Sequence, residues 1–353
     1  MNDSPSLSEI IEKKLNEEKT LQVEQPEQTK QNEQDENIGR NEFFKVQSAS
    51  TWIAEAAKRP TPKKLFDGFW FENEICILFA DTNTGKSILA VQIGDSISSG
   101  IPIQGFSMDA AQQKILYVDF ELSDKQFQIR YTNNQGEVYP FSNMFIRAEV
   151  NSDCELQEGM SFEQHVVQSL ENAIIKHGCK TVIIDNITYL REDNEKGRDA
   201  LSMMKELKAL KSKYDLSILC LAHVPKRDNS KPLNRNDLAG SKMLINFCDS
   251  AFAIGESSSD SSIRYLKQIK TRNDTLKYDA ENVVVFQIEK PNCFLHFVFK
   301  DYAAESEFLR QPSKEDKEKR TAEAKTMKSE GKTNKQIGEY FHVSEGAVRK
   351  WLK

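Results

Sequence analysis

One short segment constrains the fold of this chain more than any other. The segment from Ala80 to Ser87, which ends in Gly85-Lys86-Ser87, joins an apolar run, residues 74–80, to a segment with helical spacing, residues 87–99. A strand, a tight loop and the start of a helix, in that order, place backbone N–H groups around a phosphate at the helix N-terminus. The sequence therefore predicts an α/β protein built around a phosphate-binding loop.

The predicted phosphate loop has a specific set of contacts. Lys86 is expected to reach the β- and γ-phosphates of ATP, and the Ser87 hydroxyl is expected to be a ligand of Mg²⁺. Ala80 stands where the strict pattern has its first glycine, a change that costs little if φ stays negative there. The residues expected to contact ATP are Asp81, Thr82, Asn83, Thr84, Gly85, Lys86, Ser87 and Ile88.

Short apolar runs and helical patterns alternate over most of the chain. The apolar runs are residues 74–80, 114–120, 143–148, 181–187, 216–222, 250–255, 263–270, 283–289 and 293–299. These β-rich runs are continuous rather than alternating, which is typical of strands buried on both faces of a mainly parallel sheet. The last three runs follow one another with short connections, so we expect the sheet to end in antiparallel strands.

Charge is distributed unevenly along the 353 residues, and it divides the chain into four segments. The first 42 residues carry eleven acidic and five basic side chains, which account for the whole formal net charge of −6. Such a polar stretch cannot bury enough apolar surface to offset its ordering entropy, so residues 1–43 are predicted to be a disordered acidic tail. We expect an ATPase core at 44–304, a charged linker at 305–330 and a helix-turn-helix at 331–353.

Cysteine usage and hydropathy indicate a cytoplasmic protein. The six cysteines have no close pair in the sequence, and several lie in apolar runs, where cysteine behaves as a small hydrophobic residue. No run approaches the ~18 apolar residues of a membrane span. A sequence pI near 5.6 argues against a protein that coats DNA along its length, but it leaves room for a locally basic groove.

Two acidic residues follow predicted strands. Asp185 ends the apolar run 181–185, in the form that a Walker B strand takes, and is expected to hold Mg²⁺ through water. A strand-end aspartate that only turns the chain is the alternative. Glu121 follows the run 114–120, which comes after the phosphate-loop helix.

An acid at the position of Glu121 resembles the RecA-like ATPases, in which that glutamate orients or deprotonates the attacking water. The resemblance implies that Glu121 is the general base, with Asp119 as the alternative. A salt-bridging acid at a strand end would leave the same pattern.

Two later segments resemble ring-forming helicases more specifically. His223, at the end of the run 216–222, is similar to the γ-phosphate sensor of the hexameric plasmid replicative helicases of the RepA type. Lys270 and Arg272 resemble the Lys-x-Arg pair of RepA-type and DnaB-type rings, which acts on the nucleotide of a neighbouring subunit. The resemblance covers residues 45–300, and it implies a single RecA-like core without a separate helical collar. An ordinary basic hairpin tip is the alternative for the Lys-x-Arg pair.

DNA contacts are expected in two places. The loop 225–241 is basic and contains glycine, which suits contact with the backbone of single strands through Lys226, Arg227, Lys231 and Arg235. A solvated surface loop is the alternative.

The segment 332–352 resembles the helix-turn-helix of resolvase- and sigma-type DNA readers. Ser344 is expected to cap its second helix. Arg349 and Lys350 would then face a groove or phosphates, and a protein-docking helical hairpin is the alternative.

Together these features predict a Mg²⁺-dependent, ATP-hydrolysing ring, most simply a hexamer, that moves on or remodels DNA. Replication or mobilisation of a plasmid, phage or mobile element is the expected setting. Two other functions stay open: a recombinase or loader that forms filaments, and a DNA-binding regulator that uses ATP as a switch with little turnover.

Overall fold

The computed structural model describes residues 44–352, except for 152, 155–158, 188–197, 225–226, 239–241, 311–313 and 342. The predicted acidic tail, 1–43, therefore lies outside the described residues. The density of internal contacts divides the chain into two units, 1–61 and 62–353. The second unit starts later than the core boundary at residue 44 that charge and hydropathy predict.

The described part of the first unit is one helix, α3 (Ala49–Ala57). The Ser48 side chain accepts a hydrogen bond from the Thr51 N–H and caps its N-terminus. None of its residues is buried, and Ile53 is 71% exposed. The helix thus forms from local capping and propensity without a packed face among the described residues.

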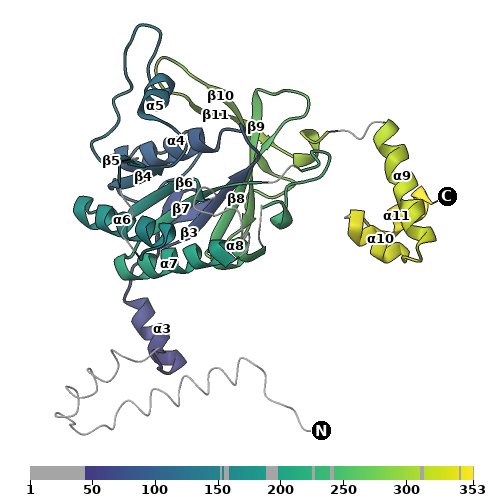
Figure 1. Ribbon diagram of the computed structural model, residues 1–353, viewed down its shortest axis with the longest axis horizontal. Helices are drawn as coiled ribbons and strands as arrows, with labels where there is room; N and C mark the ends of the chain where they lie inside the picture. Colours follow the sequence, from purple (N-terminus) through teal and green to yellow (C-terminus); the bar gives the residue numbers. More distant parts are fainter. Residues whose placement is uncertain are drawn as a thin grey trace, which may run out of the picture. The chain divides into compact units, whose positions relative to one another are not determined.

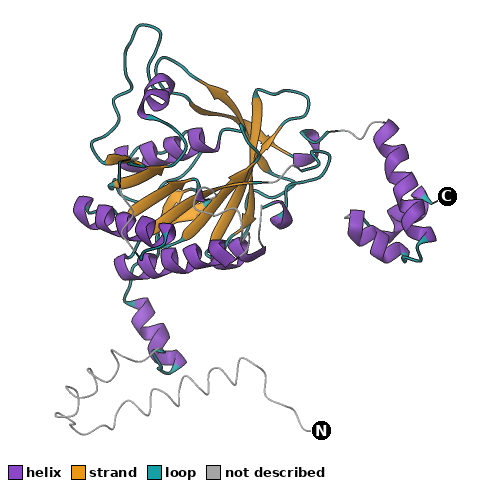
Figure 2. Ribbon diagram, viewed as in Figure 1, coloured by secondary structure: helices purple, strands orange, loops and turns teal. Residues whose placement is uncertain are grey.

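A sheet of nine strands forms the centre of the second unit (Figures 1 and 2). Its spatial order is β11-β10-β9-β8-β3-β7-β6-β4-β5. The strands are β3 (Ile75–Ala80), β4 (Ile115–Asp119), β5 (Phe145–Glu149), β6 (Thr181–Asp185), β7 (Ser217–His223), β8 (Ser250–Glu256), β9 (Ile263–Lys270), β10 (Val283–Glu289) and β11 (His296–Ala303). Each of the nine apolar runs in the sequence supplies one of these strands.

The pairing confirms the predicted mixed sheet. All pairs from β8 through β3, β7, β6 and β4 to β5 are parallel, whereas β9, β10 and β11 add antiparallel strands at one side. A two-stranded piece, β1 (Lys64–Phe66) with β2 (Trp70–Phe71), precedes the large sheet. The α/β fold with a mainly parallel sheet that ends in antiparallel strands is therefore confirmed.

Helices cover both faces of the sheet, as Figure 1 shows. The helices are α4 (Lys86–Ser99), α5 (Asp124–Arg130), α6 (Phe162–His177), α7 (Arg198–Tyr214) and α8 (Lys242–Phe247). Side chains of β3 alternate between two hydrophobic clusters: Ile77 packs with α6 and α7 on one face, and Leu78 packs with α4 on the other. Burial on both faces explains why the strands are continuous apolar runs.

The helix ends follow from local sequence. In α6 the Ser161 hydroxyl accepts from the Gln164 N–H, and the Gln164 side chain accepts from the Ser161 N–H, which is a capping box. Gly178 ends this helix with a φ of 65°, a conformation that glycine adopts without a Cβ clash. These two caps set where α6 begins and ends.

Three helices, α9 (Lys314–Ser329), α10 (Asn334–Phe341) and α11 (Glu345–Trp351), form a small C-terminal cluster. Met327 of α9 packs with Ile337, Phe341 and Val348 of the other two. Gly338 lies so close to the turn that an added Cβ would stand 2.7 Å from the Val343 carbonyl oxygen. Three residues join α10 to α11, as a tight helical turn requires.

The charged linker expected at 305–330 is corrected at both ends. Glu305, in the short 3₁₀ turn η3 (Glu305–Glu307), is 1% exposed and forms an ion pair with Lys267 of β9. Helix α9 occupies the second half of the segment and belongs to the C-terminal cluster. Its apolar contribution is only Ala324 and Met327, one helical turn apart, so the high charge of the segment hid the buried face.

No helix among the described residues is both long enough and apolar enough to cross a membrane.

Candidate active site

The parallel strands bring the predicted site residues to one edge of the sheet. Ala80, at the end of β3, pairs with His223 at the end of β7, and Asp119 of β4 pairs with Asp185 of β6. Because the carboxyl ends of parallel strands meet at the same edge, the phosphate loop and the strand-end acids share it. Ligands of open α/β sheets bind at this edge.

The phosphate loop is shaped by two residues with positive φ. Asn83 has a φ of 62°, and Gly85, which precedes the first residue of α4, has a φ of 102°. A Cβ on Gly85 would lie 2.9 Å from side-chain atoms of both Ile288 and Phe297. Glycine is required here by backbone conformation and by space together.

Lys86 turns back onto its own loop. Its Nζ donates to the carbonyl oxygens of Ala80 at 3.1 Å and Asp81 at 2.8 Å. Burial lowers the pKa of Lys86, and the negative charges of Glu121 and Asp185 oppose this effect. The lysine is thus a largely desolvated cation beside two carboxylates, a setting that strengthens its attraction for phosphate oxygens.

Asp185 has the environment of a magnesium-side acid. Tyr117 donates to its Oδ2 at 2.5 Å, and its Oδ1 is buried without a hydrogen-bond partner among the described residues. Burial raises the pKa of Asp185 to about 6, although hydrogen bonds from Ser87 and Tyr117 oppose the rise. An unpaired buried carboxylate oxygen next to the Ser87 hydroxyl fits the oxygen ligands that Mg²⁺ takes in phosphate-loop proteins.

Glu121 is held by two neighbours at the same edge. Its Oε1 accepts from the Asn186 amide, and it lies 3.0 Å from Nε2 of His223. The hydrogen bond to His223 lowers the pKa of Glu121, and the charges of His223 and Lys86 act in the same direction while burial opposes them. Glu121 is therefore ionised at neutral pH and about one-third exposed, so it is accessible to water.

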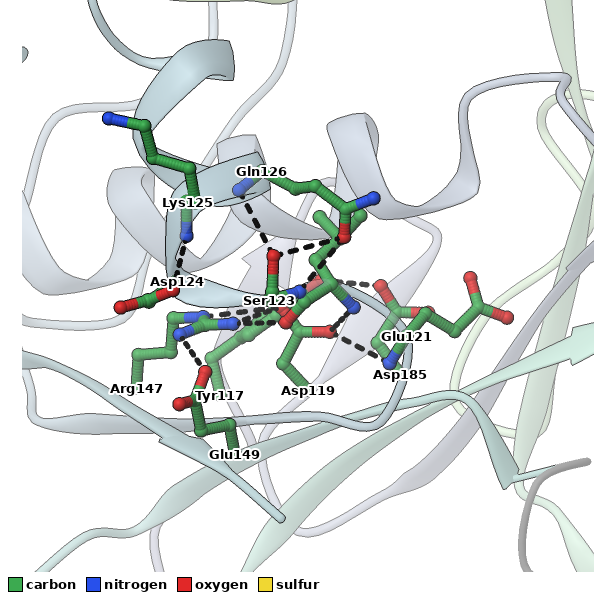
Figure 3. Close-up of polar contacts among 11 residues, drawn as sticks. Tyr117, Asp119, Glu121, Ser123, Asp124, Lys125, Gln126, Arg147, Glu149 and Asp185 are labelled. Atoms are coloured by element: carbon green, nitrogen blue, oxygen red, sulfur yellow. Dashed lines mark hydrogen bonds and ion pairs between the residues drawn. The ribbon is translucent and has the colours of Figure 1, made fainter. Parts of the chain in front are cut away.

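Asp119 has a different environment, shown in Figure 3. Its carboxylate accepts from the backbone N–H groups of Glu121 and Leu122, and from the Arg147 guanidinium at 3.0 Å. The Asp119 side chain is fully buried. These contacts fix the turn that carries Glu121, so Asp119 fits a structural role better than the role of alternative base.

Lys270 and Arg272 do not lie with the other site residues. Lys270 pairs with Ala251 near the start of β8, whereas Ala80 pairs with Ile254 further along that strand, so the pair is at the opposite edge. The Lys270 Nζ donates to the carbonyls of Ile245 and Cys248 at the end of α8, and burial lowers its pKa. Arg272 donates to Asp249 at 3.0 Å.

The basic loop 225–241 is anchored in its described part. The Leu233 N–H donates to Glu305 at 2.6 Å, and the Lys267 ammonium donates to the Leu233 carbonyl at 2.8 Å. Arg227 is turned inward, with its side chain 11% exposed, onto Asp237 and the Lys231 carbonyl. The contacts of Arg227 in the structure are therefore within the loop, and its contact with DNA stays a prediction.

The other residues expected to contact DNA have mixed positions. Arg235 is exposed in the 3₁₀ turn η2 (Arg235–Asp237), Lys231 is half-buried, and Lys226 lies outside the described residues. In the C-terminal cluster, Lys350 is exposed, and Arg349 forms a 2.7 Å ion pair with Glu345 on the same helix.

Comparison with protein families decides the class of the chain. The family model of the AAA domain matches residues 41–229, which is more than half of the chain. The chain belongs to the AAA-domain family. The matched segment of this AAA protein contains Lys86, Glu121, Asp185 and His223, whereas Lys270 and Arg272 lie beyond it. Its membership establishes a P-loop ATPase that binds nucleotide. No curated protein sequence matches the chain.

Three side chains that contact the site residues of this AAA protein were not predicted from the sequence: Asn186, Tyr117 and Arg147. Asn186 directly follows Asp185, so its position after a strand-end acid was a usable signal. Tyr117 shares a strand face with Asp119, since the two are two residues apart, but a tyrosine in an apolar run gives no sign of a polar partner. Arg147 comes from the neighbouring strand β5, and only strand pairing reveals it.

Proposed function

We propose that this AAA protein hydrolyses Mg²⁺-ATP as a DNA-dependent ring of the helicase or translocase type. The proposed setting is replication or mobilisation of a plasmid, phage or mobile element. One observation carries the proposal: Glu121, an accessible carboxylate held by Asn186 and His223, lies at the phosphate-loop edge. A protein that only switches on ATP binding has no need for such a positioned base.

The residues divide the work of hydrolysis. Lys86 holds the β- and γ-phosphates, and Ser87 and Asp185 would hold Mg²⁺, which neutralises charge on the phosphate oxygens. Glu121 accepts a hydrogen bond from the attacking water and receives its proton. His223 and Asn186 orient that carboxylate. Because His223 ends β7, a change of nucleotide at Glu121 can shift the end of this strand, where the anchored loop begins.

The position of Lys270 and Arg272 supports action between subunits. Ala251 and Ile254 are three residues apart on β8, so Lys270 lies roughly 10 Å along the sheet from the end of β3. Arg272 lies beyond it, away from the phosphate loop of its own chain. A charge that stabilises the transition state at such a distance must serve a neighbouring subunit, as the fingers of a hexameric ring do.

The C-terminal cluster supports contact with duplex DNA. Lys325 and Lys328 of α9 line one hollow together with Arg349 of α11, which gathers three cations from two helices. Exposed cations on a small helical unit suit phosphate contacts. The single strand would be contacted within the ring by Arg235 and Lys231.

A second function is favoured by a specific observation. Lys270 and Arg272 are both bonded within their own chain, to α8 carbonyls and to Asp249. If they stay there, the protein is an ATP-switched DNA-binding regulator. A filament of the recombinase or loader type would use the same fingers in an open assembly.

Steady-state ATPase measurements with and without single-stranded DNA test the proposal. We expect turnover that rises with DNA and that depends steeply on protein concentration, because a monomer has an incomplete site. Lys86→Ala, which removes the phosphate countercharge, is the control for background hydrolysis. Binding of ATP without turnover, at concentrations where rings form by sedimentation, would favour the regulator instead.

A further inference from the structure

The phosphate loop accepts a hydrogen bond from a buried arginine of β9, a strand that lies outside the matched AAA segment. Arg264, near the start of β9, is 7% exposed. Its Nε donates to the carbonyl oxygen of Thr84 at 3.1 Å. Thr84 immediately precedes Gly85, so this contact reaches the centre of the loop from a strand that is 180 residues further along the chain.

The remaining donors of Arg264 fix the guanidinium itself. Nη1 donates to the carbonyls of Ser261 at 2.5 Å and Ile263 at 3.0 Å, and Nη2 forms a 3.1 Å ion pair with Glu256. Arginine has five N–H donors in a rigid fork, and here the described contacts use them on three sides. The direction of the Nε–H bond is therefore set by contacts outside the phosphate loop.

Because a peptide group is planar, the contact with the Thr84 carbonyl also sets the direction of the Gly85 N–H. The Thr84 carbonyl and the Gly85 N–H belong to the same planar trans peptide, in which the two groups point in opposite directions. Holding the carbonyl toward β9 turns the N–H away from β9. Gly85 precedes the first residue of α4, so its N–H has no partner inside the helix and is available to a phosphate oxygen.

Other contacts of the antiparallel strands act on the same loop and helix. Ile288 of β10 and Phe297 of β11 fill the space beside Gly85 where a Cβ would clash. The Gln92 side chain of α4 makes two hydrogen bonds with the Phe297 backbone, at 3.0 and 2.9 Å. The phosphate loop and α4 are thus held in place by contacts from β9, β10 and β11.

We propose that Arg264 is a positioning residue for the phosphate site, which orients the Gly85 N–H toward the phosphates of a nucleoside di- or triphosphate. The proposal rests on the proposed ATPase function. It predicts that β9 contributes to nucleotide affinity through Arg264, a residue that acts on the phosphate-loop backbone and not on the nucleotide itself.

Nucleotide titration by calorimetry tests this role in the full-length protein. Arg264→Met removes the donor and keeps the aliphatic stem, and we expect Mg²⁺-ADP to bind about tenfold to a hundredfold more weakly, the range for a hydrogen bond to a charged group. Glu256→Gln is the matched control: it removes the ion pair of a half-exposed glutamate and should change ADP affinity by no more than about twofold.

The division between KM and kcat separates positioning from general loss of structure. In Arg264→Met we expect a higher KM for ATP, with kcat at saturation within about threefold of the original, since Glu121 is untouched. Arg264→Lys keeps the charge and the pairing with Glu256 but lacks the Nε donor, so it should fold and show the same weakening. Melting temperatures without nucleotide accompany each titration.

Each outcome decides the matter. ADP affinity equal to the original in a folded Arg264→Met or Arg264→Lys protein would overturn the proposal. Failure of both variants to fold would make Arg264 a core residue and would also overturn it. If the original protein binds neither ADP nor ATP, the ATPase function itself fails, and that result is distinct because it does not involve the variants.

Discussion

The two edges of the central sheet use charged side chains differently. At the edge where the parallel strands end, Lys86, Glu121 and Asp185 lie close enough to shift one another's pKa values. At the opposite edge, Lys270 and Arg272 are bonded to backbone carbonyls and to Asp249. The first edge has the unpaired oxygen and the accessible carboxylate of a catalytic site, whereas the second has satisfied groups.

The contrast between the two edges shows where the proposed catalytic groups are gathered. The phosphate edge holds the proposed base Glu121, the phosphate-loop lysine Lys86 and the proposed magnesium ligand Asp185. Arg264 is turned to the back of the loop and is occupied. In the proposed ring, a neighbouring subunit supplies the charge at the γ-phosphate, and Arg272, with its side chain 52% exposed, is accessible to such a neighbour.

The largest expected effect on the rate of ATP hydrolysis comes from a substitution at the opposite edge. Arg272→Ala should bind ADP normally but hydrolyse ATP roughly 10³–10⁵ times more slowly, the range of known arginine fingers. The measurement is kcat at a protein concentration where assemblies form by sedimentation. Lys270→Ala should act in the same direction.

Mixing of inactive variants shows where the finger acts. Glu121→Gln subunits keep a good finger and Arg272→Ala subunits keep a good base, so mixed rings contain some complete sites and should regain turnover. If mixed assemblies form but stay inactive, the second edge is structural only, and the ATP-switched regulator becomes the better explanation.

At the phosphate edge, Glu121→Gln should lower kcat by roughly 10²–10⁴ while ATP binding persists, since the amide holds water but cannot take its proton. Asp119→Asn is the comparison variant. Because Asp119 bonds Arg147 and two backbone N–H groups, its main effect should be on the melting temperature. Normal hydrolysis by Glu121→Gln would return the role of base to Asp119.

A smaller effect, on the free energy of unfolding, is expected for substitution of Asp249, the partner of Arg272. Asp249 accepts from the Ile75 N–H at 3.0 Å and from Lys211 at 3.2 Å as well as from Arg272. Asp249→Ala should lower the free energy of unfolding by about 1–3 kcal/mol, measured by urea denaturation, since it leaves these donors unsatisfied. Arg272→Ala, which removes a half-exposed partner, should cost no more than about 1 kcal/mol. Equal losses would show that the arginine is part of the fold.

Much of the fold and part of the site were predictable from the sequence. The nine strands were visible because burial on both faces leaves continuous apolar runs, and the phosphate loop was visible because Gly85 and Lys86 are required at fixed spacing. Strand-end acids followed from the same pattern, since parallel strands bring their ends together.

The rest depends on contacts that sequence spacing does not encode. Arg147 comes from β5, which pairs with β4, and Arg264 comes from β9, two strands away from β3; they are 28 and 180 residues away from their partners. Helix α9 was hidden because only Ala324 and Met327 of a highly charged segment are buried. The inward direction of Arg227 was also not predictable, because composition reports charge but not the direction of a side chain.

The smallest expected effect on turnover comes from removing the C-terminal cluster. A protein that ends at Arg310 keeps the Glu305–Lys267 pair and the hydrogen bond from the Arg310 N–H to the Asn229 carbonyl at 3.0 Å. It loses α9, α10 and α11, whose apolar core, from Ala324 to Val348, is made of their own residues. Both edges of the sheet stay intact, so kcat with single-stranded DNA should stay within about twofold.

Duplex binding supplies the contrast for this truncation. Loss of Lys325, Lys328 and Arg349 should weaken duplex binding and lower its salt slope by about 0.9 for each phosphate contact removed. The control is Lys325→Gln with Lys328→Gln in the full-length protein, which should reproduce part of the loss without a change in turnover. A large fall in kcat on truncation would mean that the C-terminal cluster completes the ring. The two edges of one sheet would then be insufficient for hydrolysis.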